Sequence, residues 1–241
     1  MVLLRDNAAR AKQAISIFWI MLGVTVIDLC LLAWQYSLMS GAQADRESVD
    51  MSMIDTSDTL RQVAVIVRVI IVILSAVFFI MWFRRAYYNL HTLPWSNARY
   101  TEGWAAGSWF VPIIWFWWPY QIMIDIWKGT QNAVRERLGE PQSAAMVGWW
   151  WALYLTSRIY KNFSAVVLGE ANDIGSFITA TKVEFFGEII TIPAIVITIV
   201  MIQRTNVFER ELIVHSETPD DSIFSDNYIP PRETIEPKLE N

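Results

Sequence analysis

Long apolar runs separated by short polar stretches make up most of this chain. A helix needs about 20 consecutive apolar residues to cross the hydrocarbon core of a bilayer, which is roughly 30 Å thick. Four runs reach that length, at residues 14–39, 60–83, 144–168 and 183–202. The pattern predicts an all-α integral membrane protein with four transmembrane helices.

A fifth apolar stretch, residues 103–127, differs from these four in composition. The sequence from Gly103 to Lys128 reads GWAAGSWFVPIIWFWWPYQIMIDIWK, and six of its residues are Trp. An ordinary spanning helix keeps its aromatic residues near its two ends. Pro112 and Pro119 each remove a backbone donor and disturb the preceding helical turn. We therefore expect a re-entrant or interfacial helical segment, with a tilted and kinked fifth span as the alternative.

The positions of Lys and Arg favour four spans over five. Basic residues near span ends collect on the cytoplasmic side of a membrane. A fully crossing fifth span would place Lys128 and Arg135 outside, and would place the acidic loop 169–182 inside. With four spans, both termini and most basic residues are cytoplasmic. These residues are Arg5, Arg10, Lys12, Arg84, Arg85, Arg99, Lys128, Arg135, Arg137, Arg204 and Arg210.

The polar stretches divide the chain into three parts. We expect a basic cytoplasmic leader at residues 1–13, a membrane domain at 14–210, and an acidic, disordered cytoplasmic tail at 211–241. Loops are expected at 40–59 and 169–182. A basic leader followed by an apolar run also describes a signal peptide, with Ala42-Gln43-Ala44 as a cleavage site. Because the first run is longer than a signal-peptide core, a retained helix is the preferred interpretation.

Five charged residues lie inside the predicted spans, where each is costly unless it is paired. They are Asp28, Arg68, Arg158, Lys161 and Glu188. At about 1.5 Å of rise per residue, Asp28 and Arg158 each lie roughly 15–16 Å from the outer ends of their spans. Lys161 and Glu188 lie roughly 8–10 Å from theirs. These depths predict Asp28–Arg158 and Glu188–Lys161 ion pairs, and they leave Arg68 as a spare cation.

Two interpretations of these charges stay open. The five residues form a binding cluster for a small anionic solute or a lipid head group, or they fix the packing and register of the helices. Trp151, Tyr154, Arg158 and Lys161 follow one helical stripe, and Glu184, Glu188 and Thr191 follow another. Stripes of opposite sign on consecutive antiparallel helices are expected to face each other.

Residues typical of catalytic or metal sites are scarce. The two histidines, His91 and His215, are too few for a metal site or a catalytic triad, and no Gly-rich phosphate loop occurs. Cys30 lies within an apolar run, so no disulfide framework is expected. Asp125 is a candidate acid or base, but a structural role beside Lys128 is preferred. With 54% hydrophobic residues, 18% charged residues and a net charge of −5, the chain is not expected to bind nucleic acid.

A set of motif residues resembles a bacterial membrane family known as domain of unknown function 4328. The residues that carry the resemblance are Arg85, Asn89, Gly103, Trp104, Gly107, Trp109, Phe110, Pro112, Pro119, Gln121, Asp125 and Trp127, within about residues 14–210. The core reads G-W-A-x-G-x-W-F-V-P, and Ile114-Trp115-Phe116 stands where the family often carries an Asn. The resemblance implies a multi-pass protein of the bacterial cytoplasmic membrane, and it implies no catalytic residue or cofactor.

The sequence therefore leads to a functional expectation without a reaction. We expect a non-enzymatic membrane module that binds a small solute, ion or lipid in the polar cluster. The alternative is a structural or interaction scaffold whose basic cytoplasmic face contacts lipid or a partner protein. The oligomeric state stays open.

Overall fold

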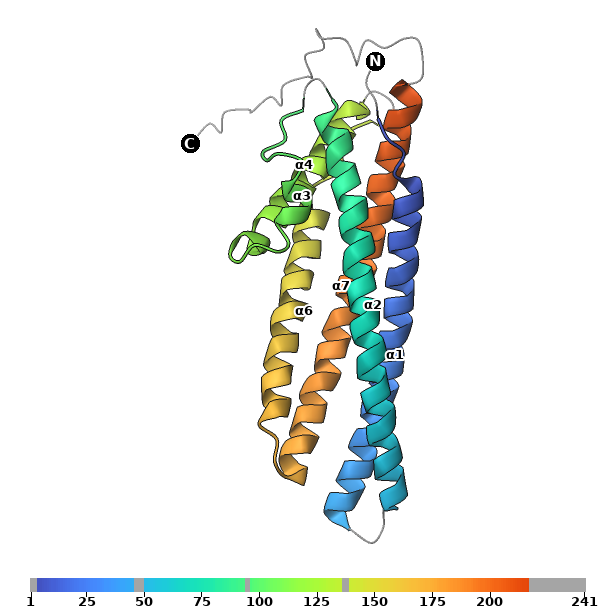
Figure 1. Ribbon diagram of the computed structural model, residues 1–241, viewed down its shortest axis with the longest axis vertical. Helices are drawn as coiled ribbons and strands as arrows, with labels where there is room; N and C mark the ends of the chain where they lie inside the picture. Colours follow the sequence, from blue (N-terminus) through green and yellow to red (C-terminus); the bar gives the residue numbers. More distant parts are fainter. Residues whose placement is uncertain (1–3, 46–49, 94–95, 136–138, 217–241) are drawn as a thin grey trace, which may run out of the picture.

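The computed structural model describes residues 4–45, 50–93, 96–135 and 139–216, and the regular structure within these residues is entirely helical. Figure 1 shows four long helices that run alternately up and down. We call the end where α1 begins and α7 finishes the terminal end, and the opposite end the loop end. The long helices are α1 (Ala8–Ala44), α2 (Met51–His91), α6 (Ala145–Gly169) and α7 (Ile174–Ser216).

Three of these helices are longer than their apolar runs. Helix propagation gains one backbone hydrogen bond per residue, so a helix continues into polar sequence until a capping residue stops it. The Asp50 side chain accepts a hydrogen bond from the Ser52 N–H at 2.9 Å and caps α2. The Asp173 side chain accepts one from the Ser176 N–H at 2.7 Å at the start of α7. The predicted loops at 40–59 and 169–182 are therefore wrong in extent, because most of their residues are helical.

The outer limits of the predicted domain also change. Residues 8–13 of the predicted leader belong to α1, and residues 211–216 of the predicted tail belong to α7. The rest of the predicted tail, residues 217–241, lies outside the described residues. The α7 helix is continuous through Pro193.

Within the residues that the structure describes, three helices are long and apolar enough to cross a membrane, at Ala8–Ala44, Met51–His91 and Ile174–Val214. The fourth long helix, α6, is not among these three. It is shorter, and Ser157, Arg158, Lys161 and Asn162 lie along its second half. The structure thus supports three of the four predicted spans by length and composition.

The Trp-rich segment folds back on itself instead of running parallel to the bundle (Figure 1). It consists of α3 (Trp104–Gly107), a 3-10 turn η2 (Ile114–Phe116) and α4 (Trp118–Ala133). The reversal is centred on Ile113, which has φ 69° and ψ −48°, and the Ile114 N–H donates to the Pro112 carbonyl at 2.8 Å. Pro119 stands in the first turn of α4, where its missing N–H needs no helical partner.

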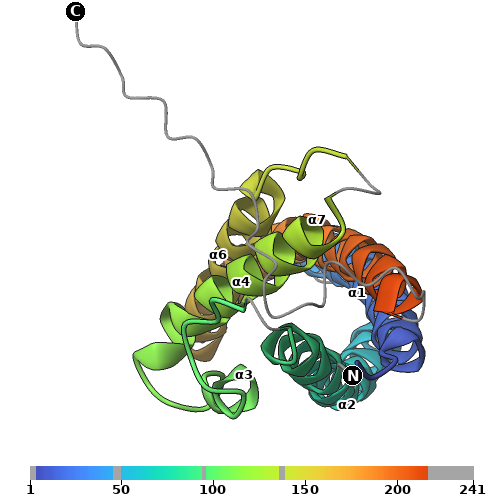
Figure 2. The ribbon, with the colours of Figure 1, turned by 90° about the horizontal axis from the view of Figure 1, so that it is seen from above.

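The helices surround a common interior that is closed on three sides. Helix α1 packs against both α2 and α7, and α6 packs against α7. Seen from the terminal end, α2 and α6 face each other with α3 beside them and α4 lying across the top (Figure 2). The Leu90 side chain on α2 packs directly against α4 at Gly129, where a Cβ would clash with Leu90 Cδ1.

Aromatic side chains fill the terminal half of this interior. Trp109 makes edge contacts with Phe79 and Phe83 on α2 and with Trp151 on α6. The Trp151 indole N–H also donates to the Phe116 carbonyl at 3.2 Å, which holds the folded-back segment against α6. Trp149 is exposed, whereas its neighbours Trp150 and Trp151 are buried and belong to this aromatic interior.

Candidate functional site

Six charged side chains of alternating sign form a continuous series that joins all four long helices. We call this series the ion ladder. In order, its members are Glu184 on α7, Arg61 on α2, Asp28 on α1, Arg68 on α2, Glu188 on α7 and Lys161 on α6.

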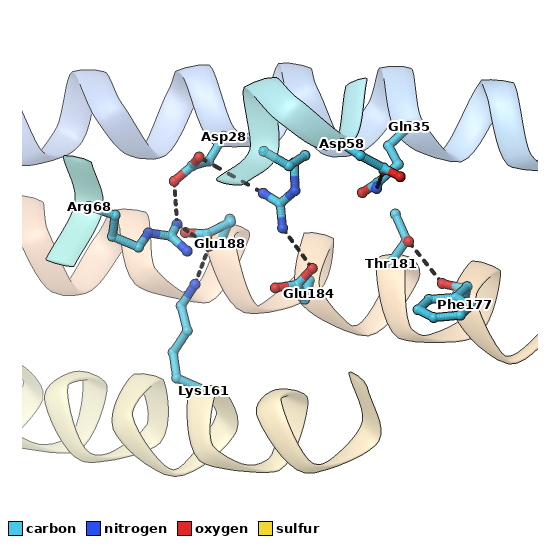
Figure 3. Close-up of polar contacts among 10 residues, drawn as sticks. Asp28, Gln35, Asp58, Arg68, Lys161, Phe177, Thr181, Glu184 and Glu188 are labelled. Atoms are coloured by element: carbon cyan, nitrogen blue, oxygen red, sulfur yellow. Dashed lines mark hydrogen bonds and ion pairs between the residues drawn. The ribbon is translucent and has the colours of Figure 1, made fainter. Parts of the chain in front are cut away.

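The contacts of the ion ladder are short. Arg61 lies 2.8 Å from Glu184 and 3.9 Å from Asp28, measured between guanidinium nitrogens and carboxylate oxygens. Arg68 lies 2.7 Å from Asp28 and also contacts Glu188. Figure 3 shows Asp28, Arg68, Glu188 and Lys161 converging from the four helices.

Burial makes this pairing necessary. The Asp28 and Glu188 side chains are 2% and 1% exposed, whereas the three cations are 11–31% exposed. An isolated buried charge costs several kcal/mol, and only close opposite charges and hydrogen bonds offset that cost. Each ladder residue has at least one opposite charge within 4 Å.

The predicted pairs are confirmed in one case and wrong in the other. Lys161 pairs with Glu188 as expected. Asp28 pairs with Arg68 and Arg61, not with Arg158, and Arg68 is therefore not a spare cation. The physical reason is the packing order, because α1 packs against α2, whereas Arg158 lies on α6, which packs against α7.

Arg61 and Glu184 are members of the ladder that the predicted cluster did not include. Their spacing carried a signal, because residues seven apart on α2 (Arg61, Arg68) and four apart on α7 (Glu184, Glu188) share one helical face.

A cavity of about 480 Å³ lies beside the ladder and is lined by all four long helices and by Trp109 and Phe110. Its volume falls within the range of about 300–1,000 Å³ that is typical of small-molecule sites. Arg68, Lys161 and Glu188 line one end, and Phe79, Trp150 and Tyr154 line the rest of its length towards the terminal end. The cavity is therefore charged at one end and mainly aromatic and aliphatic elsewhere.

Several polar groups of the cavity wall have no hydrogen-bond partner within the described part of the chain. They are Ser75 Oγ, Glu188 Oε2 and Trp109 Nε1. Ser75 is 4% exposed and Glu188 is 1% exposed, so surface solvent does not reach them freely. Buried polar groups normally have a partner in the protein, in ordered water or in a ligand.

Arg158 differs from the ladder cations. It lines the cavity and is exposed, and no carboxylate of the described residues lies within ion-pair distance of it. All five sequence-predicted cluster residues therefore lie together, four of them in the ion ladder and Arg158 on the wall of the adjoining cavity.

The motif residues of the folded-back segment serve mainly to hold it in place. Tyr100 stacks on Trp118 at 4.0 Å between ring centroids and hydrogen-bonds to Gln121. The Trp127 indole donates to the Gln142 carbonyl at 3.3 Å. Phe110 differs from these residues, because it is 75% exposed and reaches the cavity.

Asp125 is held by Arg99 in the same region. Its carboxylate accepts a hydrogen bond from the Arg99 backbone N–H at 3.2 Å and lies 3.3 Å from the Arg99 Nε. Burial raises the pKa of Asp125, and both contacts from Arg99 oppose that rise. The partner of Asp125 is thus Arg99, and the structural role expected beside Lys128 stays a prediction.

A second buried polar group, at the terminal end, was not recognised in the sequence. Glu209 is 2% exposed, and its carboxylate accepts hydrogen bonds from the side-chain amides of Asn7 at 2.9 Å and Asn89 at 3.1 Å. The Asn89 side chain also bonds the backbone N–H and carbonyl of Arg5. The motif residue Asn89 thus ties the start of the chain to α2 and α7.

Comparison with known families agrees with these motif positions. A family model described as a domain of unknown function, DUF4328, matches residues 45–207. The chain belongs to this family. Neither a curated protein nor a solved structure matches it.

The DUF4328 match covers α2, the folded-back segment, α6 and most of α7. It begins at residue 45, so α1 lies outside it, although the resemblance had been expected from about residue 14. The matched part therefore supplies five of the six ladder residues, and α1 contributes Asp28. Helix α1 also closes the cavity through Phe18, Met21, Val24 and Thr25.

Proposed function

We propose that this DUF4328 protein is a multi-pass membrane protein that binds an anionic molecule in the cavity beside the ion ladder. The proposal rests on one observation, the charge balance of the site. Three carboxylates of the ladder face three ladder cations. Arg158 is a fourth cation, without a carboxylate partner among the described residues, and it stands on the cavity wall. A bound anion would supply the opposite charge that the Arg158 guanidinium lacks among the described residues.

The chemistry of the cavity limits the ligand further. The Arg158 guanidinium provides hydrogen-bond donors at the wall, and the Ser75 hydroxyl, which has no partner within the described part of the chain, can donate or accept. An Arg guanidinium presents several donors in one plane, which suits a carboxylate or a phosphate. Phe79, Trp150 and Ile195 line the remaining volume, which favours an apolar portion on the same molecule.

We further propose four spans, with α6 as the fourth, and both termini in the cytoplasm of a bacterium. In this arrangement the terminal end carries Arg84, Arg99 and Arg135, in agreement with the positive-inside rule. The loop end, with Asp50 and Asp173, then faces outward.

A scaffold role is the second candidate. The basic face at the terminal end supports it, because Arg5, Arg84 and Arg85 all lie close enough to Arg10 to repel its charge. Other residues of that face are already neutralised, since Arg99 pairs with Asp125 and Arg135 with Glu140. We therefore rank binding in the cavity first.

The test is the loss of the Arg158 charge. Protein in phosphatidylcholine nanodiscs is assayed for binding of radiolabelled dodecyl phosphate by scintillation proximity. We expect Arg158→Leu to weaken binding by about ten- to 100-fold, because a hydrogen bond to a charged group contributes about 1.5–3 kcal/mol. Arg204→Leu is the matched control, since Arg204 is an exposed cation that does not line the cavity, and it should bind like the wild type.

Two results would reject the proposal. One is equal affinity of wild type and Arg158→Leu, and the other is no measurable binding by folded wild-type protein. A loss of the same size in Arg204→Leu would indicate a general charge effect at the surface and would favour the scaffold role.

A further inference from the structure

The cavity opens through the side of the bundle, between α2 and α6. The lining residues on α7, such as Glu188, are buried, as is Thr25 on α1, whereas the other lining residues on α1 are only partly exposed. The lining residues that are exposed are Val72 and Ala76 on α2, Arg158 on α6 and Phe110 in the folded-back segment. We call these four residues the mouth. They lie along the middle of the helices, away from both ends of the bundle.

The protein surface around the mouth is apolar. Val69, Ile73 and Val77 on α2 are 47–57% exposed, and Ile159 and Phe163 on α6 are 60% and 54% exposed. Helices that cross a bilayer present such surfaces to lipid chains. A molecule that reaches Arg158 through this opening therefore comes from the hydrocarbon region of the membrane, with its apolar part already dissolved there.

The dimensions of the cavity fit one extended chain. Its lining residues on α2 run from Arg68 to Ile80, which corresponds to roughly 18 Å at about 1.5 Å per residue. The volume of about 480 Å³ lies in the lower half of the usual range of small-molecule sites. A long, narrow and mainly apolar space with a charged end matches a single acyl chain that carries one acidic head group.

The folded-back segment closes the mouth towards the terminal end. Trp109 is anchored between Phe79 on α2 and Tyr154 on α6, with ring centroids 5.5 and 5.9 Å away. Phe79 also stacks on Trp150 of α6 at 6.1 Å between ring centroids, so aromatic contacts join α2 and α6 at this end of the cavity. Phe110, the neighbour of Trp109, extends this cover over the mouth.

From these features we infer that the ligand is a single-chain anionic lipid that enters sideways from the bilayer between α2 and α6. Its head group pairs with Arg158, and its chain extends along Phe79 and Trp150 beneath Trp109. This inference rests on the proposed function and specifies the class and the source of the ligand. The alternative source of the same anionic chemistry is a free phosphate or carboxylate in water.

The test closes the mouth after the protein has folded. In a Cys30→Ala background, Ala76→Cys is labelled in detergent with N-benzylmaleimide and then returned to phosphatidylcholine nanodiscs. Val77→Cys is the matched control, because Val77 is the next residue on α2, is 47% exposed and does not line the cavity. Labelling is quantified by mass spectrometry, and binding of radiolabelled dodecyl phosphate is compared with and without the label. Millimolar inorganic phosphate is then tested as a competitor.

We expect the label at position 76 to weaken the binding of dodecyl phosphate at least about tenfold. The label at position 77 should leave this binding unchanged. Inorganic phosphate should not compete with dodecyl phosphate. Unchanged binding after complete labelling at position 76 would overturn lateral entry. Full competition by inorganic phosphate would show that the ligand is an aqueous anion. In both cases the proposed function still holds if Arg158→Leu weakens the binding of dodecyl phosphate. The experiment therefore distinguishes failure of lateral lipid entry from failure of the proposed function.

Discussion

At the scale of single residues, Glu188 joins the last two cations of the ion ladder. One carboxylate oxygen contacts both Arg68 and Lys161, and the side chain is 1% exposed. Asp28 gives Arg68 a second partner, whereas Glu188 is the only ion-pair partner of Lys161 among the described residues. The loss of Glu188 therefore leaves one cation largely unpaired in a poorly hydrated place.

Glu188→Gln should destabilise the protein by about 3–5 kcal/mol, because removing one partner of a buried ion pair leaves an uncompensated charge. SDS titration of detergent-solubilised protein, followed by circular dichroism, measures this change. Glu184→Gln is the control at the end of the ladder, where the carboxylate is 21% exposed, and it should cost less. The double variant Glu188→Gln/Lys161→Met should recover more than half of the loss. A double variant as unstable as Glu188→Gln would show that Lys161 is not the source of the cost.

The grouping of these residues was predictable, but their pairing was not. Counting residues from the span ends predicted one cluster in which Asp28 and Arg158 lie deeper than Lys161 and Glu188, and the structure brings Asp28, Lys161 and Glu188 together through Arg68. The distance of a residue from the end of its span does not indicate which helices are neighbours in the bundle. Because α1 packs against α2 and not against α6, Asp28 meets Arg68, and Arg158 is left for the cavity. Glu209 escaped notice because the residues that bind it, Asn7 and Asn89, lie far away in the sequence.

At the scale of elements, the folded-back segment shows what composition predicts well. Two prolines and many Trp residues predicted that residues 103–127 would not form an ordinary helix, and the chain does turn back there. The position of the turn was not predictable, because it falls on Ile113, a β-branched residue with positive φ. Such residues rarely adopt this conformation, and a γ-turn of this hand is strained.

Ile113→Gly should stabilise the protein by about 1–3 kcal/mol, because Gly adopts positive φ without the clash that Ile suffers. The Ile113 side chain is 87% exposed, so little protein packing is lost with it. Ile113→Ala is the matched control, since Ala also removes the apolar side chain but keeps a Cβ at the strained position. Thermal unfolding of the detergent-solubilised protein, followed by circular dichroism, should rank Gly above wild type and Ala no higher than wild type. Equal midpoints for Gly and Ala would show that the turn is not strained in solution.

At the scale of the whole molecule, alternating helix directions bring both described ends of the chain to one end of the bundle (Figure 1). The order of the long helices followed from the apolar runs, and the helical boundary of α6 was predicted within one residue. The cavity was not predictable as a shape, because it arises where α2 and α6 meet through aromatic side chains, Phe79 with Trp150 and Trp109 with both helices. A pattern of apolar residues predicts which helix faces are buried, but it does not predict how closely two buried faces pack against each other.

The proposed four-span topology predicts opposite sidedness for the two ends of α6. In a Cys30→Ala background, one cysteine is introduced at Gln142, at the terminal end, or at Asn172, at the loop end, and both positions are exposed. Intact bacterial spheroplasts are treated with a membrane-impermeant maleimide, and total cysteine is measured after lysis. We expect Asn172→Cys to be labelled in intact cells and Gln142→Cys only after lysis, because α6 crosses the membrane between them. The reverse result would place the terminal end outside and break the positive-inside rule at Arg84 and Arg99. Equal protection of both positions would mean that α6 does not cross, and the mouth between α2 and α6 would then no longer face lipid.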